Sequence, residues 1–158
     1  MNLFKGFYPV AILFLIMTQT SHARDMSGRL GVGYLNEFIA STPSISVKYG
    51  MTKDMAVQGL AGFDTAIPTS STFGGKIFKN LFYESNMNFY AAFGLAYVKT
   101  QRSGVEILSL IGAEFFIPGI ESLGLSFEAG ASVSNVSGSF AVKTVGFSFL
   151  QAGTHFYF

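Results

Sequence analysis

Seven charged residues stand at positions where they could form ion pairs or line a channel. They are Arg29, Lys48, Lys76, Glu106, Glu114, Glu128 and Lys143. Each falls in an extended segment on the side that otherwise carries mostly Gly, Ser and Ala, opposite the apolar side. A buried ionised group costs several kcal/mol unless an opposite charge or a hydrogen bond satisfies it. The mixed signs therefore predict an ion-pair network wherever the fold encloses these side chains.

His155 is the one histidine after residue 23 and the natural candidate for a catalytic base. Nucleophilic catalysis would need a serine and a carboxylate beside it. His155 shares its phase with Tyr157, and Glu114 and Glu128 are the carboxylates nearest to it by height along the strands. No serine stands at a convincing position. We therefore expect an interior histidine that fills space and makes a hydrogen bond, and we predict no catalytic residue.

Alternating apolar and polar residues predict β-strands through most of the chain. In residues 44–51, Ile45, Val47 and Tyr49 alternate with Ser46 and Lys48, the period of a strand with one apolar face. The same pattern gives eight extended segments: 29–38, 44–51, 55–64, 73–81, 88–99, 105–117, 123–134 and 141–158. An even number of strands joined in order by turns predicts an all-β fold, an eight-stranded antiparallel up-and-down barrel.

The direction of the apolar face decides which class of barrel this is. A soluble sandwich or lipocalin-like barrel turns that face inward, whereas a membrane barrel turns it toward lipid. The chain is 49% hydrophobic, yet after residue 23 no apolar run reaches the roughly 18 residues of a membrane helix. The best run, residues 89–98, matches a tilted membrane strand. We predict a transmembrane barrel with the charges inside, and a secreted soluble β-protein is the alternative.

The interior of an eight-stranded barrel is just wide enough for side chains to fill. With both chain ends at one end of the barrel, which we take as the lower one, the predicted lower half holds Arg29, Lys48, Glu114 and Glu128. Lys76, Glu106 and Lys143 are predicted nearer the outer rim. We expect these residues to plug the lumen. A selectivity filter for ions or small solutes is the alternative interpretation of the same residues.

The N-terminus predicts export. Lys5 precedes an unbroken apolar run over residues 10–17, and Ser21-His22-Ala23 supplies small residues where a signal peptidase cleaves. We expect a signal peptide at 1–23 and a single domain at 24–158. The net charge of +1 without a basic run argues against nucleic-acid binding, and the absence of a Cys/His cluster argues against a metal site. No cofactor is expected.

The last strand carries the most specific motif. The chain ends on Phe158, with Phe156 and Leu150 in the same alternate phase and the weaker Thr154 and Ala152 between them. With the signal segment and the strand meander, this ending resembles the small outer-membrane barrels of Gram-negative bacteria, the class of the outer-membrane protein A transmembrane domain and the OmpX-like proteins. The resemblance implies that Leu150, Phe156 and Phe158 form a C-terminal assembly signal for the barrel-assembly machinery. It also implies an outer-membrane location among lipid and lipopolysaccharide.

These observations predict a monomeric, non-enzymatic barrel with a structural or surface-contact role. Its outer loops are expected near residues 39–43, 65–72, 100–104 and 135–140, and they are too short for a large recognition surface. A narrow channel for ions or small solutes is the first alternative. The second is a lipid A-modifying enzyme, because some small outer-membrane barrels have that activity.

Overall fold

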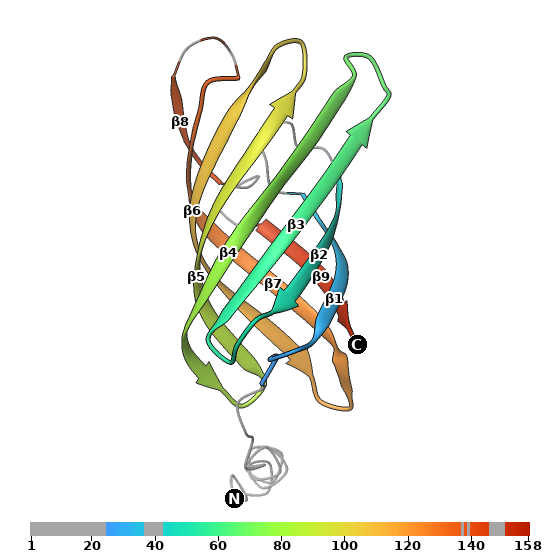
Figure 1. Cartoon of the computed structure of the whole chain (residues 1–158), viewed down its shortest axis with the longest axis vertical. Helices are drawn as coiled ribbons and strands as arrows, with labels where there is room; N and C mark the ends of the chain where they lie inside the picture. Colours follow the sequence, from blue (N-terminus) through green and yellow to red (C-terminus); the bar gives the residue numbers. More distant parts are fainter. Residues whose placement is uncertain (1–24, 37–42, 137, 139, 146–150) are drawn as a thin grey trace, which may run out of the picture.

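The computed structural model describes residues 25–36, 43–136, 138, 140–145 and 151–158. The predicted signal peptide at 1–23 and Leu150 lie outside this part of the chain. Figure 1 shows tilted strands wrapped around one long axis. The strands are β1 Leu30–Leu35, β2 Ser44–Gly50, β3 Met55–Asp64, β4 Ser70–Glu84, β5 Met87–Lys99, β6 Ser103–Ile117, β7 Ile120–Ser134, β8 Ala141–Thr144 and β9 Gln151–Tyr157.

The sheet closes on itself with every neighbouring pair antiparallel. Strands β1 to β7 pair in sequence order, and β9 lies between β7 and β1. The upper part of β7 pairs with β8 and its lower part with β9, so these two segments share the eighth position of the barrel. The predicted eight-stranded, antiparallel, up-and-down barrel is confirmed. Among the described residues, no helix is long and apolar enough to cross a membrane.

Several predicted strands were too short, whereas the first two were too long, since β1 ends at Leu35 and β2 at Gly50. β4 extends from Ser70 to Glu84, beyond both ends of the predicted segment 73–81. β7 begins at Ile120 instead of residue 123. Gly119, with a φ of 87°, turns the chain sharply after Pro118, so β6 and β7 extend right up to the turn. The predicted closing strand 141–158 is described as two strands, β8 and β9.

The two ends of the barrel differ in their connections. We call the end where Phe158 bonds to Leu30 the lower end; it carries the tight turns around residues 51–54, 85–86 and 118–119. The upper end carries the connections 65–69 and 100–102, and β1 and β7 end there while β2 and β8 begin there. The chain therefore enters β1 from the lower end, and the C-terminus lies in the lower half of the barrel, as Figure 1 shows.

The apolar face of the strands points outward, as the sequence predicts. Phe127 and Val133 expose 38% and 40% of their surface, whereas Glu128 and Lys48 each expose 6%. Large apolar side chains cover the outside of every long strand. A soluble barrel would show the reverse arrangement. The secreted soluble alternative therefore does not fit the fold.

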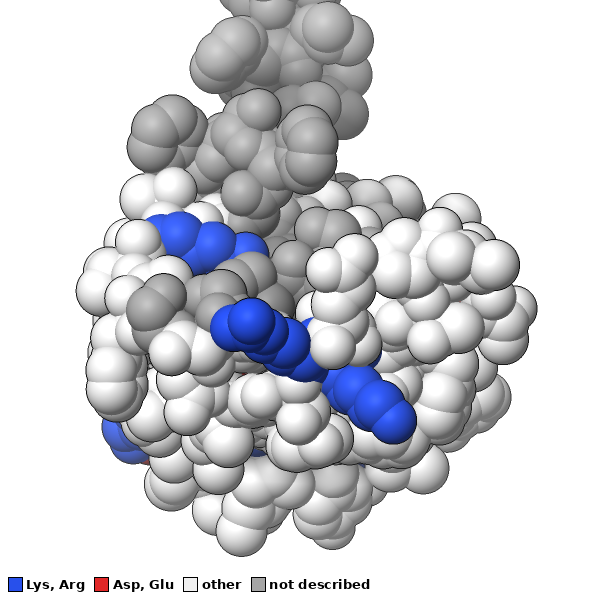
Figure 2. Space-filling model, turned by 90° about the horizontal axis from the view of Figure 1, so that it is seen from above, with Lys and Arg blue, Asp and Glu red and all other residues white. Residues whose placement is uncertain are grey.

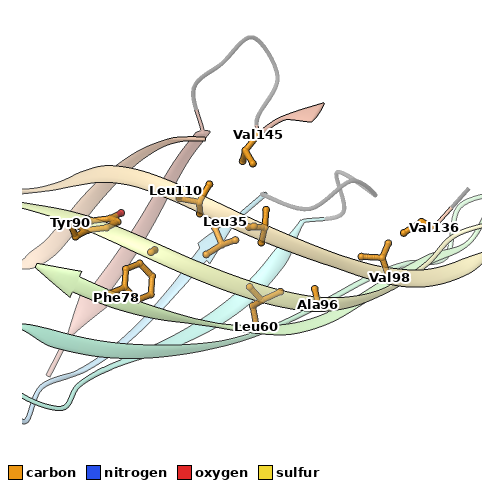
Figure 3. Close-up of a cluster of buried hydrophobic side chains, with 11 residues drawn as sticks. Leu35, Leu60, Phe78, Tyr90, Ala96, Val98, Leu110, Val136 and Val145 are labelled. Atoms are coloured by element: carbon orange, nitrogen blue, oxygen red, sulfur yellow. The ribbon is translucent and has the colours of Figure 1, made fainter. Parts of the chain in front are cut away.

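Side chains fill the interior around the charged residues. Figure 3 shows buried apolar groups that project from several strands toward the axis, among them Leu60, Phe78, Val98 and Leu110. Interleaved with them are inward polar residues such as Ser132, exposed by 1%. Such a packed interior is what the small diameter of an eight-stranded barrel permits, and it holds the charged groups in fixed positions.

Candidate functional site in the barrel interior

Lys48, Glu114 and Tyr157 form a buried cluster in the lower half of the interior. The three residues come from β2, β6 and β9. Lys48 Nζ lies 2.8 Å from Glu114 Oε2, and the Tyr157 hydroxyl donates a hydrogen bond of 2.6 Å to Glu114 Oε1. Both carboxylate oxygens therefore have a partner. That is the condition under which a buried ion pair is tolerated.

Lys76, Glu128 and Tyr90 repeat this arrangement with residues from β4, β7 and β5. Lys76 Nζ lies 2.8 Å from Glu128 Oε2, and the Tyr90 hydroxyl donates a hydrogen bond of 2.7 Å to Glu128 Oε1. The sequence pattern placed Lys76 near the upper rim and Glu128 in the lower half, and this separation was wrong. Because barrel strands are tilted, counting residues from a turn gives a poor estimate of height.

Phe78 joins the two clusters. Lys48 Nζ lies 4.4 Å from the centroid of its ring, and Lys76 Nζ lies 5.1 Å from it. The same ring meets Tyr90 edge to face, with 5.1 Å between centroids. An aromatic face attracts a desolvated cation, so Phe78 supports both ammonium groups. The result is one continuous block of charged and aromatic side chains across the lumen.

Two glycines leave the room that these clusters need. A Cβ on Gly124 would stand 2.8 Å from Glu114 Oε1 and 3.0 Å from the Tyr157 ring. A Cβ on Gly112 would stand 2.9 Å from both Glu128 Cγ and the Tyr90 ring. Contacts this short require a shift of the neighbouring atoms. Each glycine therefore permits one Tyr–Glu contact.

His155 has a serine partner that the sequence analysis missed. Ser46 Oγ lies 2.7 Å from His155 Nε2, and Gln58 Nε2 lies 3.0 Å from the same nitrogen. Gly33 on β1 lies between them in the sheet, because it pairs with Ser46 on β2 and with His155 on β9. A Cβ at Gly33 would stand 2.6 Å from the imidazole. Gly33 is the one residue in the sequence that could have indicated this contact. Its pairing with both residues follows only from the register in which β9 closes on β1.

This Ser–His pair lacks the other features of a catalytic site. Ser46 exposes 1% of its surface and His155 2%, so neither is open to a substrate. Among the described residues, His155 Nδ1 has no hydrogen-bond partner, so no carboxylate orients the ring. A Ser–His–acid triad needs that third group. His155 fills space in the interior and makes a hydrogen bond to Ser46 on β2, as we expected for an interior histidine.

The three other predicted interior residues are Glu106, Lys143 and Arg29. Glu106 on β6 is completely buried in the upper half of the barrel. Lys143 on β8 and Arg29 just before β1 are half-buried, and neither forms an ion pair with another described residue. Of the seven, Lys48, Lys76, Glu114 and Glu128 form the two ion pairs described above.

The terminal aromatics lie on the outer face at the lower end. Phe156 is 45% exposed and Phe158 72%, and their rings meet edge to face at 5.2 Å. The Phe158 amide donates to the Leu30 carbonyl at 2.9 Å, which ties the last residue to β1. These two positions of the predicted assembly signal therefore lie on the outer face of the barrel.

Little free space remains around the charged block. Two cavities beside it have volumes of about 10 and 20 Å³. A cavity holds one water molecule at about 10–15 Å³ of such volume, so each has room for a single water. In the described part of the chain, no group of three or more His, Cys, Asp or Glu side chains could hold a metal ion.

Comparisons with known proteins bear on the fold. No protein-family model and no curated protein matches the chain. Among solved structures, the chain is similar to the crystal structure of the N-terminal β-barrel domain of Pseudomonas aeruginosa OprF, with a TM-score of 0.56 and 12% identity. The match covers 84% of this chain and 98% of that domain. The chain therefore has the eight-stranded barrel fold of the OprF N-terminal domain.

Proposed function

We propose that this chain is an integral outer-membrane barrel protein with a structural, non-enzymatic role and a lumen plugged by side chains. One observation carries the proposal. Two Lys–Glu–Tyr clusters, joined through Phe78, cross the interior of a barrel whose outer face is apolar. Charges inside and apolar groups outside suit a protein embedded in lipid.

An outer-membrane location agrees with several independent features. Among the described strands, none in the lower half of the closed sheet leaves a long unpaired edge, as a hydrocarbon environment demands. The fold is shared with the OprF barrel domain. Phe156 and Phe158 are exposed where barrel-assembly machinery could bind them during insertion. Outer-membrane lipid and lipopolysaccharide would then surround a monomeric barrel.

The upper end supports a surface-contact role. With the chain ends in the periplasm, the connections 65–69, 100–102 and 135–140 face the cell exterior. Figure 2 shows Lys and Arg side chains gathered on this end. Its described basic residues at strand ends and in loops are Lys99, Arg102 and Lys143. Cationic groups at this height would face the phosphate groups of lipopolysaccharide.

Two measurements test the proposal. The folded protein should migrate faster than the boiled protein on a denaturing gel and should fractionate with the outer membrane. In planar lipid bilayers it should give no stable conductance. A reproducible single-channel step would overturn the plug in favour of a narrow channel. Lipid A modified by the purified protein, with the modification lost in His155→Ala, would instead establish an enzyme.

A further inference from the structure

The outer face carries an apolar groove that the plug does not explain. It runs across β4 to β7 and has a volume of about 420 Å³. Small outward residues, Ala91, Ser109 and Ala129, form its floor, and the larger Ile77, Phe93 and Ile111 rise beside them. The register brings these residues together, because Ala91 pairs with Ile111 and Ile111 with Ala129.

A polar cluster adjoins the groove on the side of the β2–β3 turn. Lys79 lines the groove and pairs with Asp54 at 3.3 Å, both side chains being about half exposed. Asp54 also accepts a hydrogen bond of 2.7 Å from the Tyr83 hydroxyl. Lys53 Nζ stands 5.2 Å from the centre of the Tyr83 ring. Lys53 in the turn and Lys79 beside it on β4 therefore lie where the apolar face meets the lower end of the barrel.

We infer that this groove is a binding site for one glycerophospholipid of the periplasmic leaflet. One acyl chain lies over Ala91, Ser109 and Ala129, and the phosphate contacts Lys79 with Lys53 beside it. The inference rests on the membrane location proposed above and is independent of whether the lumen is plugged.

The chemistry of the site favours a lipid over a second barrel. A flexible chain can follow a narrow concave strip and contact both its floor and its walls, and many such contacts add up to a large dispersion energy. A barrel surface is convex and would leave the floor uncovered. The lysines supply positive charge where a lipid phosphate lies, and a charged hydrogen bond of this type is stronger than a neutral one. A second copy would bring the same cations against them.

The test compares lipid retention between matched variants in detergent. Phosphatidylglycerol is added to the refolded protein, and native mass spectrometry measures the bound fraction as collision energy strips loosely held lipid. We expect one lipid to remain on the wild type. Ala91→Phe/Ala129→Phe, which fills the groove, should retain at least about tenfold less, an affinity change of about 1.4 kcal/mol. The control is Ala61→Phe, another outward alanine, which does not line the groove.

The phenylalanine substitutions could prevent folding, and the absence of a gel shift on boiling would reveal this. A second variant then keeps the test valid. Lys79→Ala should weaken retention of phosphatidylglycerol several-fold, whereas Lys99→Ala at the opposite end should not. Diacylglycerol, which lacks the phosphate, should be retained less than phosphatidylglycerol by the wild type. Equal retention by wild type and groove variants would overturn the site. So would a dimer that disappears in Ala91→Phe/Ala129→Phe, because it would show that a second copy occupies the groove.

Discussion

Lys48 on β2 and Glu114 on β6 meet inside the barrel, with 2.8 Å between Nζ and Oε2. Sixty-six positions separate them in sequence. Such a contact depends on closure of the whole sheet, because neither residue neighbours the other's strand. The pair therefore couples opposite parts of the barrel wall.

Removing one member of this pair should destabilise the folded barrel strongly. Glu114→Gln would leave the Lys48 ammonium buried without its counter-ion, and breaking a buried pair in this way costs about 3–5 kcal/mol. Urea unfolding in detergent micelles, followed by gel mobility, measures the free energy of unfolding. The double variant Lys48→Met/Glu114→Leu should recover part of the loss. A single variant as stable as the wild type would show that the ion pair contributes nothing.

Replacing a glycine by alanine should destabilise the barrel at an inward position beside a cluster but not at an outward position. Gly124→Ala would push a methyl group against Glu114 and Tyr157, and overpacking of this kind costs about 1–3 kcal/mol. The matched control is Gly59→Ala on the outer face of β3, where a Cβ meets nothing within 4 Å. It should be neutral or slightly stabilising, because alanine restricts the unfolded chain. The same unfolding measurement compares the two, and equal effects would contradict the close packing described around Gly124.

Much of the fold was accessible from sequence because strand periodicity is local. The alternation in residues 44–51 and 123–134 correctly placed Lys48 and Glu128 inside. The pairing of charges was not accessible, since it depends on the tilt and register of strands that are distant in sequence. The Ser46–His155 contact was missed for the same reason: it arises only when β9 closes against β1 at Gly33. Strand ends were missed where a tight turn, as at Gly119, extends the pairing.

Shortening the side chains at the centre of the charged block should open the lumen. In Lys76→Ala/Glu128→Ala both partners of one ion pair are removed together, and space appears beside Phe78 and Tyr90. We expect planar-bilayer recordings to show a stable conductance that the wild type lacks. Ile77→Ala/Phe93→Ala, which shortens two outward residues, is the control and should stay silent. A silent double variant that still shows the gel shift would mean that other side chains close the lumen.

The stability of the folded barrel should depend on pH through Asp54 in the β2–β3 turn at the lower end. The hydrogen bond from Tyr83 and the adjacent Lys79 ammonium hold the pKa of Asp54 below its ordinary value of 3.8. A lowered carboxyl pKa adds stability that is fully present above the unfolded-state pKa and is lost as the pH falls through the folded-state pKa. Tyr83→Phe removes the largest cause, so the pKa of Asp54 should rise toward 3.8 and this contribution should shrink. Carboxyl-carbon NMR titration in micelles measures it, with Tyr97→Phe on β5 as the control. An unchanged midpoint in Tyr83→Phe would show that the hydroxyl does not bind the carboxylate in solution.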